Sequence, residues 1–268
     1  MQDTMTPKER WSAVINREKP DRVPMDYWGT PEITEKVMAY LGVDDYWAMV
    51  ERLHIDAVVT VSPAYVGPKI KDGHDFYGCG YRCVDYGTGA YDEVISHPLA
   101  DFKTIEDVET NYQWPTADWF DFTVLPDQLR GRETYPVRGG GSEPFYHYTL
   151  MRGLKQAIID MAANPDFLHY CLGKLFDFSY EFTRRIFEHV PGRVMISYVA
   201  EDFGSQENLL FSPGQIREFF LPGMKRMFDL VHQAGAYAFT HSDGAIRKII
   251  SRPDRDRCGY PQPHPMAL

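Results

Sequence analysis

Hydrophobic and polar positions follow two alternating periods along the chain, and this alternation predicts strands that are each followed by a helix. Residues 56–62 are rich in β-branched residues, which is typical of a strand covered on both faces. Residues 164–186 instead repeat their apolar positions every three or four residues, which predicts a helix with one buried face. The same two patterns recur through most of the sequence.

Capping residues mark where the predicted helices begin. Thr6 with Glu9, and Ser212 with Gln215, have the spacing of a capping box, and a proline follows each cap. The sequence predicts helices over residues 7–17, 31–40, 46–53, 117–130, 144–161, 164–186 and 213–234 (kinked at Pro222), and a further helix start at Ala245. Strands are predicted over residues 23–27, 56–62, 135–138, 194–199 and 236–240.

At least five strand-helix units in series predict an α/β fold of the (β/α)8 TIM-barrel type, occupying residues 1–250. Residues 63–115 differ in texture, with Gly, Tyr and Asp in place of the regular pattern. We expect them to form a small antiparallel β excursion after the second strand, inserted in the barrel domain. A doubly wound sheet is the alternative fold, but the glycine-rich phosphate loop of nucleotide-binding sheets does not follow the first strand.

Composition narrows the range of partners. The 268 residues carry a formal charge of -10, the wrong sign for binding a phosphate backbone, so nucleic acid is not expected. Apolar runs are far too short to cross a membrane, and we expect a cytoplasmic protein. Four cysteines are too few for a disulfide framework; Cys79 and Cys83 as half of a zinc site is a minor alternative.

Acidic and polar side chains follow the strand predicted at 194–199. Glu201 and Asp202 are adjacent, so in an extended chain one faces the barrel mouth while the other supports a loop or caps a turn. We predict that both are catalytic, with Asp202 as the principal residue, and that Gln206 in the same loop binds substrate. The alternative is that these carboxylates only begin the next loop.

His241 and Asp243 follow the strand predicted at 236–240. Alternate residues of an extended segment point the same way, so His241 and Asp243 can share one zinc ion or one proton path. We predict both as metal ligands and His241 as catalytic. The structural alternative is that His241 bonds a neighbouring strand end and Asp243 caps the helix at Ala245.

Further substrate-binding candidates lie at the ends of two other strands. Gly140, within a run of three glycines before a helix, allows a ligand close to the backbone, although a flexible turn explains it equally. Tyr27 and Trp28 after the first strand, and Arg138 after the third, are predicted to line a pocket, the alternative being that they only pack.

Five segments together resemble the uroporphyrinogen decarboxylase superfamily: residues 6–10 (TPKER), 20–24 (PDRVP), 200–206 (AEDFGSQ), 211–213 (FSP) and 241–244 (HSDG). The resemblance covers residues 6 to 250 and implies a (β/α) barrel whose site lies at the C-terminal face. The superfamily includes the porphyrinogen decarboxylase and the methylcobamide:coenzyme M methyltransferases.

Two departures from the family patterns guide the function that the resemblance implies. The arginine-rich segment that clamps the decarboxylase's carboxylated substrate is absent after Val23 and Pro24. His241 matches the first ligand of the methyltransferases' H-x-C-G zinc motif, whereas Asp243 replaces its cysteine. We therefore expect an enzyme of corrinoid-linked methyl transfer, with zinc as candidate metal and a corrinoid as substrate or carried by a partner protein.

Other functions stay open. Uroporphyrinogen decarboxylation, which would need no cofactor, is the alternative enzyme activity, with Asp202 stabilising a protonated pyrrole. A non-catalytic, degenerate barrel that binds a small ligand is the alternative outside enzymes. A homodimer is considered because related barrels are often dimers.

The last segment breaks the pattern. Residues 251–268 are polar and rich in proline, without any period. Back-translation with permitted codons and a skip of one nucleotide allows PGLIEIGVDILNPIQWR, which resembles the next strand-helix unit of the superfamily. We therefore expect an irregular tail produced by a frameshift near codon 250 and a barrel incomplete at its C-terminus; an unrelated, genuine tail is the alternative.

Overall fold

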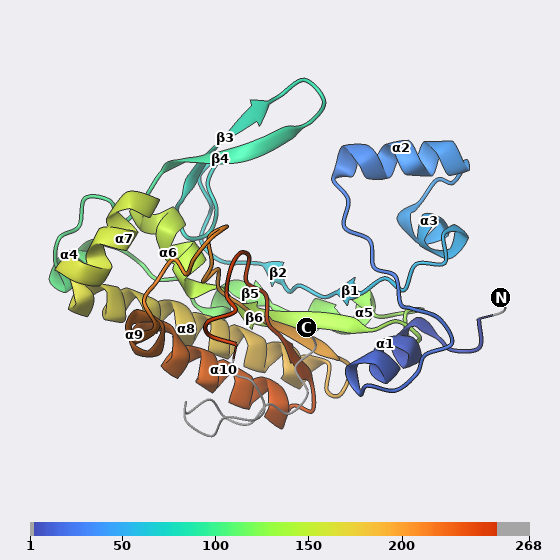
Figure 1. Cartoon of the computed structure of the whole chain (residues 1–268). Helices are drawn as coiled ribbons and strands as arrows, with labels where there is room; N and C mark the ends of the chain where they lie inside the picture. The colour runs from blue at the N-terminus through green and yellow to red at the C-terminus, as the bar shows by residue number, and fades with distance from the viewer. Residues whose placement is uncertain (1–2, 251–268) are drawn as a thin grey trace.

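A four-stranded parallel sheet forms the centre of the computed structural model, which describes residues 3–250 (Figure 1). Its order is β1 (Val59–Thr60), β6 (Val137–Ser142), β7 (Ile196–Val199) and β8 (Tyr237–Phe239). Each pair of neighbours is parallel, as expected for strands joined by helical crossovers. The predicted α/β class with a parallel sheet is confirmed; within residues 3–250 the sheet is open and does not close into a barrel.

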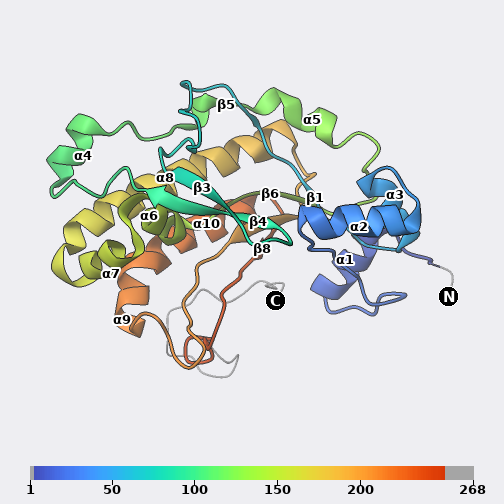
Figure 2. The ribbon, with the colours of Figure 1, turned by 90° about the horizontal axis from the view of Figure 1, so that it is seen from above.

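Two long helices, α8 (Pro165–His189) and α10 (Leu221–Gln233), run along one face of this sheet (Figures 1 and 2). α8 buries a stripe of residues at helical spacing, among them Phe167, Cys171 and Leu175, as the sequence predicted. One cavity described below is lined by Thr60, Arg138 and Ile196 of these strands and by no residue of α8, whereas another includes Phe178 and Phe182 of α8. This arrangement makes the side chains that point away from α8 available for binding.

The predicted excursion contains an antiparallel hairpin, β3 (Gly80–Asp85) with β4 (Ala90–Ser96), which projects from the body of the molecule (Figure 1). Before it, β2 (Ala64–Tyr65) pairs antiparallel with β5 (Phe120–Asp121). After it comes the short helix α4 (Ile105–Asn111). The antiparallel pairing therefore extends to residue 121.

The N-terminal helices begin where the caps predict. Helices α1 (Pro7–Ile15), α2 (Pro31–Leu41) and α3 (Tyr46–Arg52) gather at one end of the molecule (Figure 2). Thr6 and Glu9 form the full capping box of α1.

The strand predicted over residues 23–27 is wrong. This segment joins no ladder, although the Asp56 N–H donates to the Met25 carbonyl at 2.7 Å. Val23 is 78% exposed, so this apolar segment is not covered as a buried strand would be. A single hydrogen bond to the neighbouring chain does not make a strand.

A buried ion network holds α1 against the chain that leads to β1. Arg10 is 1% exposed and pairs with Asp21 (Nε to Oδ1, 2.6 Å) and with Asp56. Arg22 also pairs with Asp56, from Nη1 to Oδ2 at 2.6 Å, and with Asp3. Every charge in this network has an opposite partner, which is the condition for burying it.

Three predicted helices are interrupted. The helix expected over 117–130 is two 3-10 turns, η1 (Ala117–Trp119) and η2 (Phe122–Val124), and one turn of α-helix, α5 (Leu125–Gln128). Strand β5 interrupts it because residues 120–121 pair with β2. The local helical preference of this segment is overridden by a tertiary strand pairing that no local sequence pattern predicts.

The other two helices are broken by glycine and proline. Gly153, at φ 83, divides the helix expected over 144–161 into α6 (Pro144–Arg152) and α7 (Leu154–Ala163). The helix expected over 213–234 consists of α9 (Pro213–Gln215), a π-turn η3 (Ile216–Phe220) and α10. The π-turn ends just before Pro222, where the predicted kink falls.

The chain after β8 contains no helix within the described residues, so the helix start predicted at Ala245 is wrong. The predicted tail, 251–268, lies outside the described residues. In the part of the chain that the structure describes, no helix is both long and apolar enough to cross a membrane.

Candidate metal site

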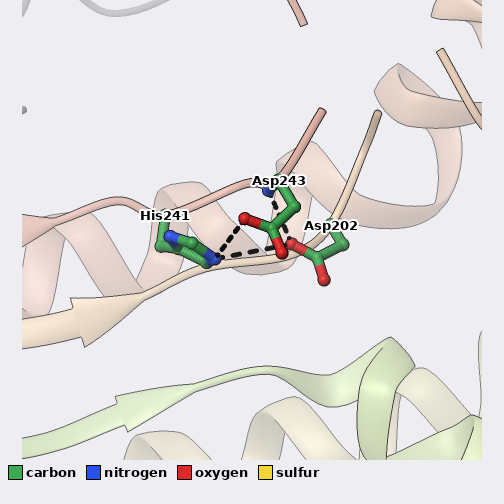
Figure 3. Close-up of side chains that lie close together, drawn as sticks. All are labelled: Asp202, His241 and Asp243. Carbon is green, nitrogen blue, oxygen red and sulfur yellow. Dashed lines mark hydrogen bonds and ion pairs between the residues drawn. The ribbon is translucent and has the colours of Figure 1, made fainter. Parts of the chain in front are cut away.

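Three ionisable side chains meet beyond the ends of β7 and β8 (Figure 3). His241 Nε2 lies 3.4 Å from Asp243 Oδ1 and 3.8 Å from Asp202 Oδ1. The Asp243 N–H donates to Asp202 Oδ1 at 2.8 Å. One ligand atom from each of the three residues lies within 4.8 Å of the others, so the three side chains predicted to act together do converge. We call Asp202, His241 and Asp243 the triad.

The register of two neighbouring strands brings the triad together. Tyr198 of β7 lies beside Phe239 of β8, and both strands run in the same direction, so their continuations emerge at one edge of the sheet. His241 and Asp243 are separated by one residue, and their side chains meet because that segment is extended.

The loops that carry the triad are tied to each other. The Phe203 N–H donates to Ser242 Oγ at 2.8 Å, and the Ala245 N–H donates to the Ser205 carbonyl at 2.7 Å. A Cβ atom at Gly204 would lie 2.6 Å from the Asp243 carbonyl, so only glycine permits this approach. The triad is therefore held by backbone contacts rather than by its own ion pairs alone.

The donor set of the triad fits a divalent metal ion. The imidazole nitrogen of His241 and a carboxylate oxygen of Asp243 are ligand atoms that zinc accepts, and the Asp202 carboxylate lies beside them. The side chains of Asp202 and Asp243 are 57% and 80% exposed, and no Lys or Arg among the described residues lies within ion-pair distance of them. Across residues 3–250, no other group of three His, Cys, Asp or Glu side chains is placed to hold a metal.

A cavity of about 540 Å3 lies beside the triad and includes two of its members. We call it the triad cavity. Tyr198 borders it, with its ring stacked on that of His241 at 6.2 Å between centroids. Its lining is Glu143, Phe145, Tyr146, Thr149, Leu154, Ile158, Tyr198, Glu201, Asp202, Leu210, Phe211 and His241.

Glu201 borders the same cavity but is only 3% exposed. Its Oε1 accepts the Phe145 N–H at 2.7 Å, and so supplies the first turn of α6 with an acceptor that Glu143, the cap residue, does not provide. Burial raises the pKa of Glu201 to about 8. The structure thus gives Glu201 the supporting contact that sequence reasoning assigned to one of the two carboxylates; its catalytic role stays a prediction.

The predicted substrate-binding residues divide between two further cavities. A cavity of about 600 Å3, the glycine cavity, is lined by Trp28, Arg138 and Gly140 among others. A cavity of about 870 Å3 near α2 is lined by Tyr27, Trp28 and Arg138. Gln206 is exposed and lines none of these three cavities.

Three residues of the site were not predicted from the sequence. Glu143 and Tyr198 border both the triad cavity and the glycine cavity, and thereby join them. His147 borders the glycine cavity, and burial lowers its pKa to about 4, which leaves the imidazole uncharged near neutrality. Glu143 lies two residues after the glycine run, and this position could have indicated it, whereas the inward direction of Tyr198 depends on the register of β7.

Within residues 3–250, no cysteine belongs to the triad. Cys79 is fully buried, and burial raises the pKa of its thiol to about 12. Cys83 is exposed on the hairpin. The alternative of a zinc site shared by Cys79 and Cys83 finds no support in this geometry.

The chain matches no protein-family model, and no curated protein matches it in sequence. Its fold is similar to that of a methyltransferase from Methanosarcina mazei, with a TM-score of 0.59 and 18% sequence identity. The similarity covers 91% of this chain and 72% of that chain. At this identity the likeness is one of fold, and membership of the uroporphyrinogen decarboxylase superfamily stays a prediction.

Proposed function

We propose that the protein is a methyltransferase that transfers a methyl group from a corrinoid to a thiol at the triad. The observation that carries the proposal is the convergence of Asp202, His241 and Asp243 at the ends of neighbouring parallel strands beside a cavity. The fold likeness to the M. mazei methyltransferase supports the same reaction class.

The triad residues have separate roles in this proposal. His241 Nε2 and an Asp243 carboxylate oxygen would hold a zinc ion, which when bound lowers the pKa of a thiol. Asp202 Oδ1 is held by the Asp243 N–H, which leaves its Oδ2 to take the thiol proton. The methyl carbon then leaves cobalt, which keeps the electron pair of the broken bond, and joins the sulfur.

Metal binding gives the first test. We expect the purified protein to bind one zinc ion per chain in calorimetry, and His241→Ala and Asp243→Asn each to weaken binding at least tenfold. His169→Ala is the matched control, because His169 also lies beside one carboxylate, that of Glu218 at 3.3 Å, but has no second carboxylate partner. Equal zinc affinity in the wild type and His241→Ala would contradict the metal role of the triad.

Activity gives the second test. Methylcobalamin with a small thiol should lose its methyl group in the presence of the zinc-loaded protein, seen as the absorbance change of the corrinoid. Asp202→Asn should lower the rate while leaving zinc bound, since it removes the proton acceptor. Unchanged turnover in Asp202→Asn would refute that role, and no turnover with any thiol would refute this methyl transfer.

The alternative functions have weaker support. Among residues 3–250, Arg138 is the one arginine that lines the three cavities described above, which is too few cations for a substrate with several carboxylates. Turnover of uroporphyrinogen would nevertheless replace the proposal with decarboxylation. Ligand binding without turnover of any methyl donor, unchanged by Asp202→Asn, would instead favour a non-catalytic barrel.

A further inference from the structure

Among the described residues, the half-buried guanidinium of Arg138 interacts with Glu143 and Tyr198 through its charge but forms no hydrogen bond with a side chain. It borders both the glycine cavity and the cavity near α2, and it makes no hydrogen bond or ion pair with any side chain in residues 3–250. Buried Arg10 and Arg152, by contrast, each pair with an aspartate. A cation that faces a cavity and is not hydrogen-bonded to a side chain is suited to an anionic ligand.

Ser142 gives a second, independent sign of a ligand in the same cavity. It is 6% exposed, and its Oγ has no hydrogen-bond partner among the described residues. Ser142 lines the glycine cavity at the end of β6, the strand that also carries Arg138. Because a buried hydroxyl without a partner costs free energy, a ligand oxygen in the cavity would stabilise it.

The wall of the glycine cavity is aromatic. Phe120 meets Phe76 edge to face at 5.3 Å and Phe182 at 5.0 Å between centroids, and all three rings line the cavity. Rings packed in this way give the cavity an apolar wall against which a planar ligand can pack.

We propose that the glycine cavity binds an aromatic carboxylic acid, with its carboxylate on Arg138, its ring against the aromatic wall, and an oxygen substituent at the far end of the ring on Ser142. Glu143 lies where the glycine cavity meets the triad cavity, and its carboxyl repels the ligand's carboxylate from that end. The ligand is thereby oriented.

The strands set the distance from this cavity to the triad. From Arg138 to His241 the path crosses two strand spacings and about four residues, which places their Cα atoms roughly 16 Å apart. This inference rests on the proposed function in one respect: the end of the ring opposite the carboxylate faces the triad.

Calorimetry on metal-free protein tests the inference apart from the proposed function. We expect benzoate to bind saturably and Arg138→Met to weaken it tenfold or more, while benzamide, which lacks the charge, binds both proteins alike. Arg217→Met is the control, since Arg217 is exposed and lines none of the three cavities. Equal benzoate affinity in the wild type and Arg138→Met, or no saturable binding to the wild type, would overturn the proposal.

Two further measurements test the roles of Arg138 and Ser142. If Arg138→Met does not fold, Arg138→Lys keeps the charge but loses the planar fork, and should weaken benzoate severalfold. 4-Hydroxybenzoate should bind more tightly than benzoate to the wild type, and Ser142→Ala should abolish that difference; a difference that survives would overturn the role of Ser142. Benzoate binding without zinc binding or methyl transfer would refute only the proposed function, and the reverse result would refute only this inference.

Discussion

Two clusters of ionisable side chains, at opposite ends of the sheet's strands, differ in how their charges are compensated. Around Arg10, two arginines and three aspartates bond one another, and Arg10 and Asp56 are almost completely buried. The triad has two carboxylates and one histidine, all at least 39% exposed, and no Lys or Arg in the part of the chain that the structure describes lies within ion-pair distance. The first cluster is saturated and structural, while the second keeps capacity for a ligand.

This difference separates structural clusters of charged residues from clusters that can bind a ligand. Burying an ion pair is tolerated only when every partner is present, so a saturated network resists any change to its members. An exposed, unsaturated cluster contributes little to stability, and its geometry is maintained by the loops that carry it. Ionisable clusters therefore point to function when they are uncompensated and border a cavity.

Breaking the saturated network should have the largest effect. Arg10→Met leaves Asp56 buried with one arginine partner fewer, and we expect a loss of about 3–5 kcal/mol in the free energy of unfolding, measured by urea denaturation. Arg130→Met is the control, because its pair with Asp127 is exposed and worth less than about 1 kcal/mol. A similar small loss in both variants would contradict the distinction drawn here.

Glu201 sharpens the comparison, because it is adjacent to Asp202 in the chain yet buried. Its pKa of about 8 lies above that of an unfolded glutamate, so the folded state holds the proton over a range where the unfolded state has lost it. Stability from this group is present below pH 4.5 and is lost as the pH rises through 8. Glu201→Gln should remove up to about 4 kcal/mol of that pH dependence.

Thermal melts at pH 5.5 and 8.5 measure this effect. The wild type should lose more of its melting temperature between these values than Glu201→Gln does. Glu109→Gln, at an exposed position of α4, should behave like the wild type. An equal loss in all three proteins would show that Glu201 is ionised in the folded state at both values.

The sequence could predict which strands deliver the triad, but not which surroundings each residue meets. The polar residues after the strands predicted at 194–199 and 236–240 marked Asp202, His241 and Asp243 as candidates, and the parallel register of β7 and β8 brings them together in the structure. Glu201 contacts the first turn of α6, and this contact depends on where α6 begins in space. No local pattern encodes that packing.

The fold shows the same limit. The long helix α8 and the capped start of α1 were predictable, since each depends on neighbours within four residues. The break at β5 was not, because Phe120 and Asp121 leave a helical pattern to pair with residues 64 and 65. Elements governed by distant pairing need the tertiary structure.

A smaller effect on stability is expected for His147, a buried residue that borders the glycine cavity. Burial lowers its pKa to about 4, so the unfolded state binds a proton that the folded state excludes. Stability from this group is full above pH 6.5 and is lost as the pH falls toward 4. His147→Phe should reduce the loss between pH 7 and pH 4.5 by up to about 3 kcal/mol in urea denaturation, whereas His169→Phe should not.

The smallest effect on stability is expected at the triad itself. Asp243 is 80% exposed and its carboxylate faces that of Asp202, so Asp243→Asn should change the free energy of unfolding by no more than about 0.5 kcal/mol. Because the substitution keeps the Asp243 backbone N–H, the contact with Asp202 Oδ1 survives. Zinc should raise the melting temperature of the wild type and not of Asp243→Asn, since only a protein that binds the ion gains stability from it. A variant that is strongly destabilised without zinc would place Asp243 with the structural charges around Arg10 and remove the reason to regard the triad as a binding site.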